Sequence, residues 1–176
     1  MPDVAASVRL RSSVQMDAIA LRPLRGGDRL PVLEVFAGLS ARSRYLRFLG
    51  AKPRLNERDL ELLVDVGRSG REAVVAVDQE TGHSIGIARF VRDPAAPEAE
   101  IAFAVVDEWQ GRGIGRRLAD ELARLARSQG ILRLRASVDR SNAAALAVVR
   151  GLGEVLATRS EGSVVELVVR LADLDE

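Results

Sequence analysis

The sequence QGRGIGRR at Gln110–Arg117 stands between an apolar run, Ile101–Val106, and a segment of helical periodicity that continues to Gln129. This order predicts a strand, a glycine-rich turn and the start of a helix. Glycines at alternate positions allow a close approach of the backbone to a ligand, and the first N–H groups of a helix lack intrahelical partners. Glycines alone are equally compatible with a tight turn into a surface helix. The arginines and the flanking pattern favour an anion site, for phosphate above all.

The segments around this turn predict the fold class. Apolar residues recur every three or four positions after the turn up to Gly130, which is placed to end the helix. The alternating segment Leu132–Val138 then predicts a strand parallel to the one before the turn. We therefore expect an α/β (α+β) fold: a mixed, mostly antiparallel sheet of about six to seven strands, flanked by helices, with one βαβ unit. The expected strands are 19–22, 73–77, 85–91, 98–106, 132–138, 155–157 and 164–171.

Capping residues set the expected helix starts. We expect short helices that end near Gly38, Leu49 and Val64 ahead of most of the sheet. A further alanine-rich helix should end at Arg150. The expected caps are Asp28, Ser40, Asn56 in a capping box with Asp59, and Ser141 or Asn142. Arginines on the second of these helices, Arg42, Arg44 and Arg47, are interpreted as a solvated face over a core stripe.

Composition narrows the function classes. The 176 residues carry 26 basic and 25 acidic side chains, so neither a nucleic-acid nor a membrane partner is implied. The absence of cysteine excludes disulfides and thiol catalysis, and the single histidine, His83, makes a zinc site or a Ser-His-Asp triad unexpected. We expect no metal, a flexible leader at 1–17, a single domain at 18–176 and a cytoplasmic location.

Two other phosphate-binding motifs fit less well. The third glycine of a dinucleotide fingerprint would fall at Arg116, and Asp139 lies 139 − 111 = 28 positions after the first glycine, further than that fingerprint prefers. Antiparallel strands also precede the turn. A P-loop is excluded because no Gly-Lys-Ser/Thr follows the glycines.

The segment Gln110–Gly115 resembles the Q/R-x-x-G-x-G/A motif of the GNAT superfamily of N-acyltransferases, and the expected element order agrees with that superfamily. The resemblance implies that loop amides hold the pyrophosphate of acetyl-CoA, that the preceding strand lends backbone groups to the pantetheine arm and acetyl carbonyl, and that an asparagine opening the last helix lies beside the cofactor arm. The cofactor-binding residues so implied are Phe103, Ala104, Val105, Gln110, Gly111, Arg112, Gly113, Ile114, Gly115 and Asn142.

Within the superfamily the chain is most similar to bacterial protein lysine acetyltransferases, judged from segments such as Ser43–Phe48, Ala88–Phe90 and Ala99–Phe103. The resemblance implies a protein lysine as acceptor, with an acyl-CoA synthetase among the candidate targets. A small amine is the alternative acceptor, and a catalytically weak acyl-CoA-binding sensor is the alternative class.

The catalytic residue implied by the resemblance is Glu100, a strand carboxylate able to take a proton from a lysine ammonium. Many superfamily members place a tyrosine acid in the last helix, where this chain has Val149. The only tyrosine, Tyr45, is expected in the core. In a regular strand Glu100, Ala102 and Ala104 share one face, and a β-bulge would change that register.

Overall fold

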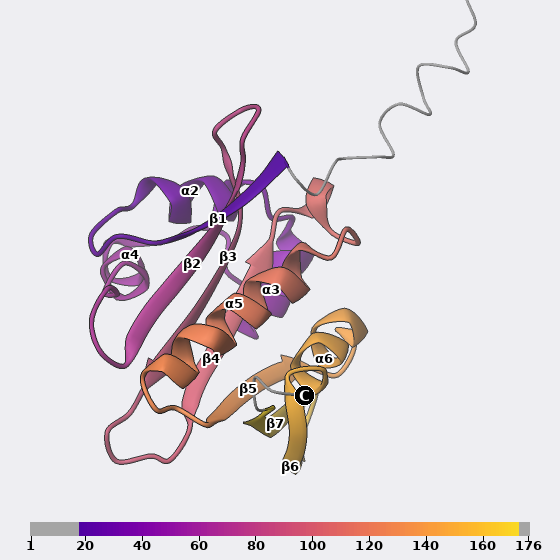
Figure 1. The fold of residues 1–176 in the computed structure, drawn as a ribbon. Coiled ribbons are helices and arrows are strands. Elements are labelled where there is room, and N and C mark those ends of the chain that lie inside the picture. Colours follow the sequence, from indigo (N-terminus) through magenta and orange to yellow (C-terminus); the bar gives the residue numbers. More distant parts are fainter. Residues whose placement is uncertain (1–17, 173–176) are drawn as a thin grey trace, which may run out of the picture.

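The computed structural model describes residues 18–172, so the predicted leader at 1–17 lies outside the described residues. Seven strands form one sheet in the order β1-β2-β3-β4-β5-β7-β6 (Figure 1). The strands are β1 (Ile19–Pro23), β2 (Arg71–Asp78), β3 (Ser84–Arg92), β4 (Ala99–Val105), β5 (Arg133–Asp139), β6 (Gly153–Glu161) and β7 (Val164–Leu171). The helices are α2 (Leu30–Ala37), α3 (Ala41–Phe48), α4 (Glu57–Leu63), the 3-10 turn η2 (Asp107–Trp109), α5 (Ile114–Ser128) and α6 (Ala143–Arg150).

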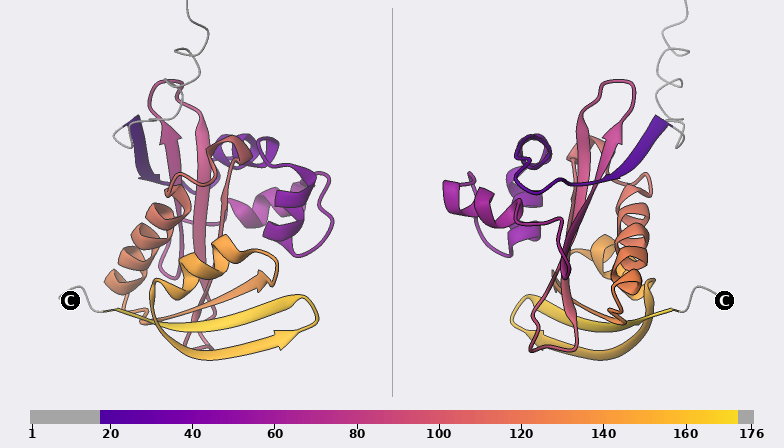
Figure 2. Two further views of the ribbon diagram at one scale, coloured as in Figure 1. Left: turned by 90° about the vertical axis from the view of Figure 1, so that its right-hand side faces the viewer. Right: turned by 60° about the vertical axis from the view of Figure 1, so that its left-hand side comes forward.

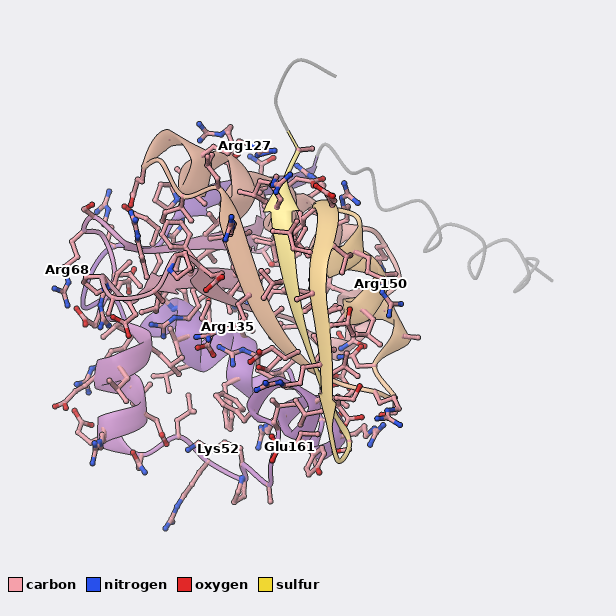
Figure 3. All side chains as sticks on the ribbon, turned by 90° about the horizontal axis from the view of Figure 1, so that it is seen from below. Lys52, Arg68, Arg127, Arg135, Arg150 and Glu161 are labelled. Atoms are coloured by element: carbon pink, nitrogen blue, oxygen red, sulfur yellow. The ribbon has the colours of Figure 1, made fainter. Side chains whose placement is uncertain are left out.

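The helices cover both faces of the sheet (Figure 2). One face packs against α5 and α6, and the buried side chains Phe90, Leu118 and Leu122 belong to this larger core. The opposite face packs against α2 and α4 through a smaller core. Gly86 in β3 permits the close approach of α5, because a Cβ there would lie 2.9 Å from Cδ1 of Leu118. The mixed, mostly antiparallel sheet predicted from the sequence is confirmed.

The parallel pair β4 and β5 is joined over a very short length. Only Ala99 opposite Leu134 and Glu100 opposite Arg135 are paired, although β4 runs on to Val105. On its other edge β4 pairs with β3 along its whole length without a bulge. The two parallel strands therefore separate after Glu100, and the free edge of β4 faces an opening in the sheet.

Most expected helix caps are confirmed. The Ser40 hydroxyl accepts a hydrogen bond from the Ser43 amide, and Asn56 forms the capping box with Asp59. Asn142 caps α6 through the Ala145 amide. The expected cap at Asp28 is wrong: α2 starts after Arg29 without a side-chain cap, and Pro31 lies in its first turn.

The closing hairpin is longer than the sequence indicated. We expected its first strand at 155–157, whereas β6 spans Gly153–Glu161 and pairs with β7 throughout. Most of β6 is exposed, so it lacks the alternation of apolar and polar residues that makes a half-buried strand recognisable. The irregularity between Val155 and Ala157 further interrupts the pattern.

Candidate active site

A cavity of about 300 Å³ occupies the opening between β4 and β5. Its floor comes from Ile101–Val105 of β4 and 136–138 of β5, and α6 contributes Ala144, Ala145 and Val148. The glycine-rich turn closes one end of the cavity. Beside the turn α3 contributes Ser43, Leu46 and Arg47, and the segment between α2 and α3 contributes Leu39.

The turn directs unpaired backbone amides at this cavity. Gly111 and Gly113 adopt φ angles of 73° and 78°, which L side chains rarely adopt. The first helical hydrogen bond runs from the Arg117 amide to the Gly113 carbonyl. Within residues 18–172, the amides from Gly111 to Arg116 donate no hydrogen bond to another described residue. The N-terminus of α5 thus combines free donors with the positive end of the helix dipole, as an anion site requires.

Side chains hold this turn against α3. The Gln110 amide group donates to the Val105 carbonyl at 3.0 Å and to the Ser43 hydroxyl at 3.3 Å. The Asp107 carboxylate accepts from the Ser40 amide at 3.3 Å. Burial opposes ionisation of Asp107, but hydrogen bonds from Ser40 and Ser43 outweigh it and lower the pKa of this carboxyl. The anion site and α3 are therefore fixed relative to each other.

The free edge of β4 offers a second set of backbone groups. The Val106 amide donates to the Ile85 carbonyl of the β3 edge, and in an antiparallel pair the direction of these bonds alternates along the strand. The N–H and C=O groups of Phe103 and Val105 consequently face away from β3, toward the cavity. The Val105 carbonyl accepts from Gln110. The remaining groups can bind an extended ligand as a further strand would.

Asn142 lines the cavity at the start of α6. The backbone N–H of Asn142 donates to the backbone carbonyl of Asp139. The buried Asp139 carboxylate accepts from the hydroxyl and the backbone N–H of Ser141. These hydrogen bonds lower the pKa of Asp139. The loop between β5 and α6 is thereby held in one conformation, which positions Asn142.

The structure brings together most, but not all, of the predicted site residues. Two of them do not line the cavity, namely Arg112 and Glu100. The Arg112 guanidinium lies 4.9 Å from the centre of the Trp109 ring. The Glu100 side chain is 61% exposed at the point where β4 and β5 separate, and its carboxylate lies 3.8 Å from Arg135. Predicted residues that line the cavity are Phe103, Ala104, Val105, Gln110, Gly111, Gly113, Ile114, Gly115 and Asn142.

The expected positions of the candidate proton donors need correction. Tyr45 was expected in the core, but it is 38% exposed, and no residue of α3 is fully buried. Val149 is buried in the core, and its neighbour Val148 lines the cavity together with Ala144 and Ala145. Neither valine is able to donate a proton. The polar side chains that line the cavity are Ser43, Arg47, Gln110, Arg116, Ser137 and Asn142.

The interpretation of the α3 arginines as a solvated face holds for Arg42, which is exposed, and is wrong for Arg44 and Arg47. The Arg44 guanidinium lies 4.0 Å from the centre of the Phe36 ring and donates to the Phe36 and Pro53 carbonyls. Arg47 is half-buried and lines the cavity. Sequence reasoning missed Arg47 because its apolar neighbours resemble an ordinary helix stripe. Only the structure shows that α3 has no fully buried residue and so has a face left for other contacts.

Comparisons with known proteins agree with this geometry. The model of the acetyltransferase (GNAT) family matches residues 40–153. The acetyltransferase Pat of Mycolicibacterium smegmatis is 35% identical over 136 residues, which are 77% of this chain and 40% of the relative. An acetyltransferase of Pseudomonas aeruginosa is 31% identical over 114 residues, 64% of this chain and 61% of the relative. The chain thus spans only part of the length of either curated relative.

Solved structures show the same fold. The GNAT domain of PAT from S. lividans has a TM-score of 0.75 and 28% identity, with 86% of this chain and 89% of that chain covered. A cAMP-binding acyltransferase from Mycobacterium smegmatis has a TM-score of 0.60 and 30% identity, with coverages of 89% and 45%. A putative acetyltransferase from Salmonella typhimurium, solved with its cofactor acetyl-CoA, shares the fold at 19% identity and a TM-score of 0.68, covering 90% and 97%.

The chain belongs to the GNAT family of acetyltransferases. Acetyl-CoA is the acetyl donor that this family uses, and the free amides of the turn are suited to its pyrophosphate. No cluster of potential metal ligands occurs within residues 18–172. In the same part of the chain no helix has both the length and the apolar character to cross a membrane.

Proposed function

We propose that this enzyme acetylates lysine side chains of proteins by direct transfer from acetyl-CoA within a ternary complex. The observation that carries the proposal is the separation of β4 from β5 after Glu100, which leaves a free strand edge leading to the unpaired amides of the turn. The likeness to proteins named Pat supports a protein acceptor.

The residues of the chain have separate tasks. The amides from Gly111 to Arg116 would donate hydrogen bonds to the pyrophosphate, and the outward backbone groups of Phe103 and Val105 would hold the pantetheine arm and the acetyl carbonyl. Asn142 would lie beside that arm. Acetyl-CoA supplies a thioester, whose carbonyl carbon is the electrophile.

Glu100 would act as the general base. Its carboxylate would accept a proton from the lysine ammonium, directly or through a water molecule, so that the neutral amine forms the new C–N bond as the C–S bond breaks. The second proton that the attacking amine loses would be transferred to the departing sulfur, which leaves as the thiol of CoA. The exposed position of Glu100 supports this role because a protein substrate approaches from solvent.

The experiment compares acceptors at equal acetyl-CoA concentration. Purified enzyme is incubated with a proteome extract that has been treated with a deacetylase, or with a panel of small amines, and both thiol release and acetyl-lysine by mass spectrometry are measured. We expect new acetyl-lysine in the extract with matching thiol release. Turnover with small amines and none with the extract would show that the acceptor is a small amine and not a protein. Tight acetyl-CoA binding without turnover would instead indicate a sensor.

A further inference from the structure

Arg47 is a partly buried cation without a counter-ion. It lies on α3, half-buried, and lines both the 300 Å³ cavity and a second, smaller cavity of about 30 Å³. Its guanidinium lies 4.9 Å from the centre of the Phe48 ring. Within residues 18–172 it makes no hydrogen bond and has no carboxylate at ion-pair distance. Partial burial removes hydration from a charge, and an anion bound at this guanidinium would offset that cost.

A second cation reaches the same small cavity from the sheet. Arg89 of β3 is half-buried and stands opposite Ala102 in the β3–β4 register. One of its nitrogens donates to the Leu62 carbonyl at 3.0 Å, and among the described residues no carboxylate lies at ion-pair distance. Arg47 and Arg89 therefore share a pocket whose other walls are largely apolar.

The electrostatics of the pair agree with an absent anion. Burial above all, together with the positive charge of Arg89, lowers the pKa of Arg47 to about 10, although the negative charge of Glu100 raises it. Burial and the positive charge of Arg71 lower the pKa of Arg89, while the negative charges of Asp65 and Glu100 raise it. An anion placed between the two guanidinium groups would remove the repulsion and offset the cost of burial.

The position of the pair separates it from the phosphate site. The small cavity lies against Ala102 and Ala104, the strand face that also carries Glu100, and it contains no residue of the glycine turn. Pyrophosphate would lie in the larger cavity against the amides of that turn, at the start of α5. The anion recognised by Arg47 and Arg89 thus belongs to the acceptor side of the site.

We propose that the acceptor carries a carboxylate that binds between Arg47 and Arg89 while its amine lies at Glu100. For the protein acceptor of the proposed function, on which this inference rests, the carboxylate is the side chain of an aspartate or glutamate close to the target lysine. In an extended peptide side chains two positions apart lie on the same side, about 7 Å from each other, so the acidic residue is expected two positions from the lysine. A guanidinium pair suits a carboxylate because each group donates two parallel hydrogen bonds.

Kinetics with paired peptides tests this proposal. The two peptides have blocked termini and differ only in the residue two positions after the lysine, Gly-Lys-Gly-Glu-Gly against Gly-Lys-Gly-Gln-Gly. Hydrogen bonds to charged groups are strong enough that we expect kcat/KM to favour the glutamate peptide by about tenfold or more. In Arg47→Gln the ratio should fall close to one. The matched control is Arg124→Gln, which removes an exposed arginine on α5 that pairs with Glu121, and it should keep the full ratio.

Three measurements decide the outcome. Equal kcat/KM for the two peptides in the unmodified enzyme, or a preference that survives in folded Arg47→Gln, would overturn the proposal. So would a weaker calorimetric affinity of Arg47→Gln for acetyl-CoA with the peptide ratio unchanged, because the cation would then serve the cofactor. Peptide binding in the presence of CoA is measured as well: if neither peptide is acetylated but the glutamate peptide binds more tightly, lysine acetylation fails as the function while the anion pocket stands.

Discussion

At the glycine turn the cavity presents main-chain N–H groups, whereas at α3 it presents the side chains of Ser43, Leu46 and Arg47. The first end depends on two left-handed glycines and the start of α5, features that are local in sequence. The second end depends on α3, β3 and β4, which meet only in the folded chain. Changes at the turn should therefore alter cofactor affinity, and changes at the α3 end should alter turnover and acceptor choice.

The largest expected effect lies at the acceptor end, in Glu100→Gln. Because general-base catalysis contributes about 10²- to 10⁴-fold, kcat at neutral pH should fall by that order, with acetyl-CoA affinity nearly unchanged. The loss should shrink as pH rises, since more of the substrate amine is then already neutral. Steady-state kinetics from pH 6 to 10 and calorimetry measure both quantities. Near-normal kcat at neutral pH would transfer the role to another group, with Glu98 or a backbone-held water next to be tested.

The next effect lies at the turn, in Gly115→Val. Gly115 lines the cavity and has an ordinary helical conformation, and a Cβ there would contact Phe103 and Val105 at no less than 3.8 Å. The larger side chain should therefore leave the fold intact but occupy ligand space, with a loss in kcat/KM of about 10²-fold. Calorimetry should show the loss in acetyl-CoA affinity. An unchanged affinity in a folded variant would contradict the placement of the pyrophosphate at this turn.

Gly113 is a less informative site for the same test. Its φ of 78° means that any side chain strains the turn itself. A loss of binding would therefore not show whether the new side chain fills the ligand's space or distorts the backbone. Comparison of Gly113→Ala with Gly115→Ala would separate them: only the first should lower the melting temperature markedly.

A smaller effect separates stability from binding. Asn142→Ala removes the α6 cap and should lower the free energy of unfolding by about 1 kcal/mol, as Asn56→Ala should for α4. Urea unfolding measures both losses. Only Asn142 lines the cavity, so Asn142→Ala alone should weaken acetyl-CoA binding. Equal affinities in the two variants would make Asn142 a cap without a binding role.

The smallest expected effect is that of Tyr45→Phe. Tyr45 is partly exposed and lies outside the residues that line either cavity, so its hydroxyl has no position from which to protonate the leaving thiolate. We expect kcat within about twofold of the unmodified enzyme, as surface changes usually have small effects. A large loss of kcat with preserved acetyl-CoA affinity would show that a proton donor is assembled around this tyrosine when the acceptor binds.

The order of strands and helices, most helix caps and the cavity-lining turn followed from sequence because each rests on local chemistry. Hydrophobic periodicity reports which face of an element is buried, and glycine spacing reports a backbone that requires φ angles unfavourable for other residues. The strand β6 was underestimated because its exposure removes the alternating pattern. Asp28 failed as a cap because a capping residue type does not determine where the first helical turn starts.

The sequence by itself determined the glycine-rich turn that resembles the GNAT motif, the βαβ unit, and Glu100 as the candidate base on the strand that leads to the turn. Tertiary structure alone decided that β4 and β5 part after Glu100, that Val148 rather than Val149 faces the cavity, and that Arg47 and Arg89 converge on one pocket. The physical reason is that a local motif is specified by the conformations of adjacent residues. A cluster of side chains from α3, β3 and β4 exists only once packing has set the distances among these three elements.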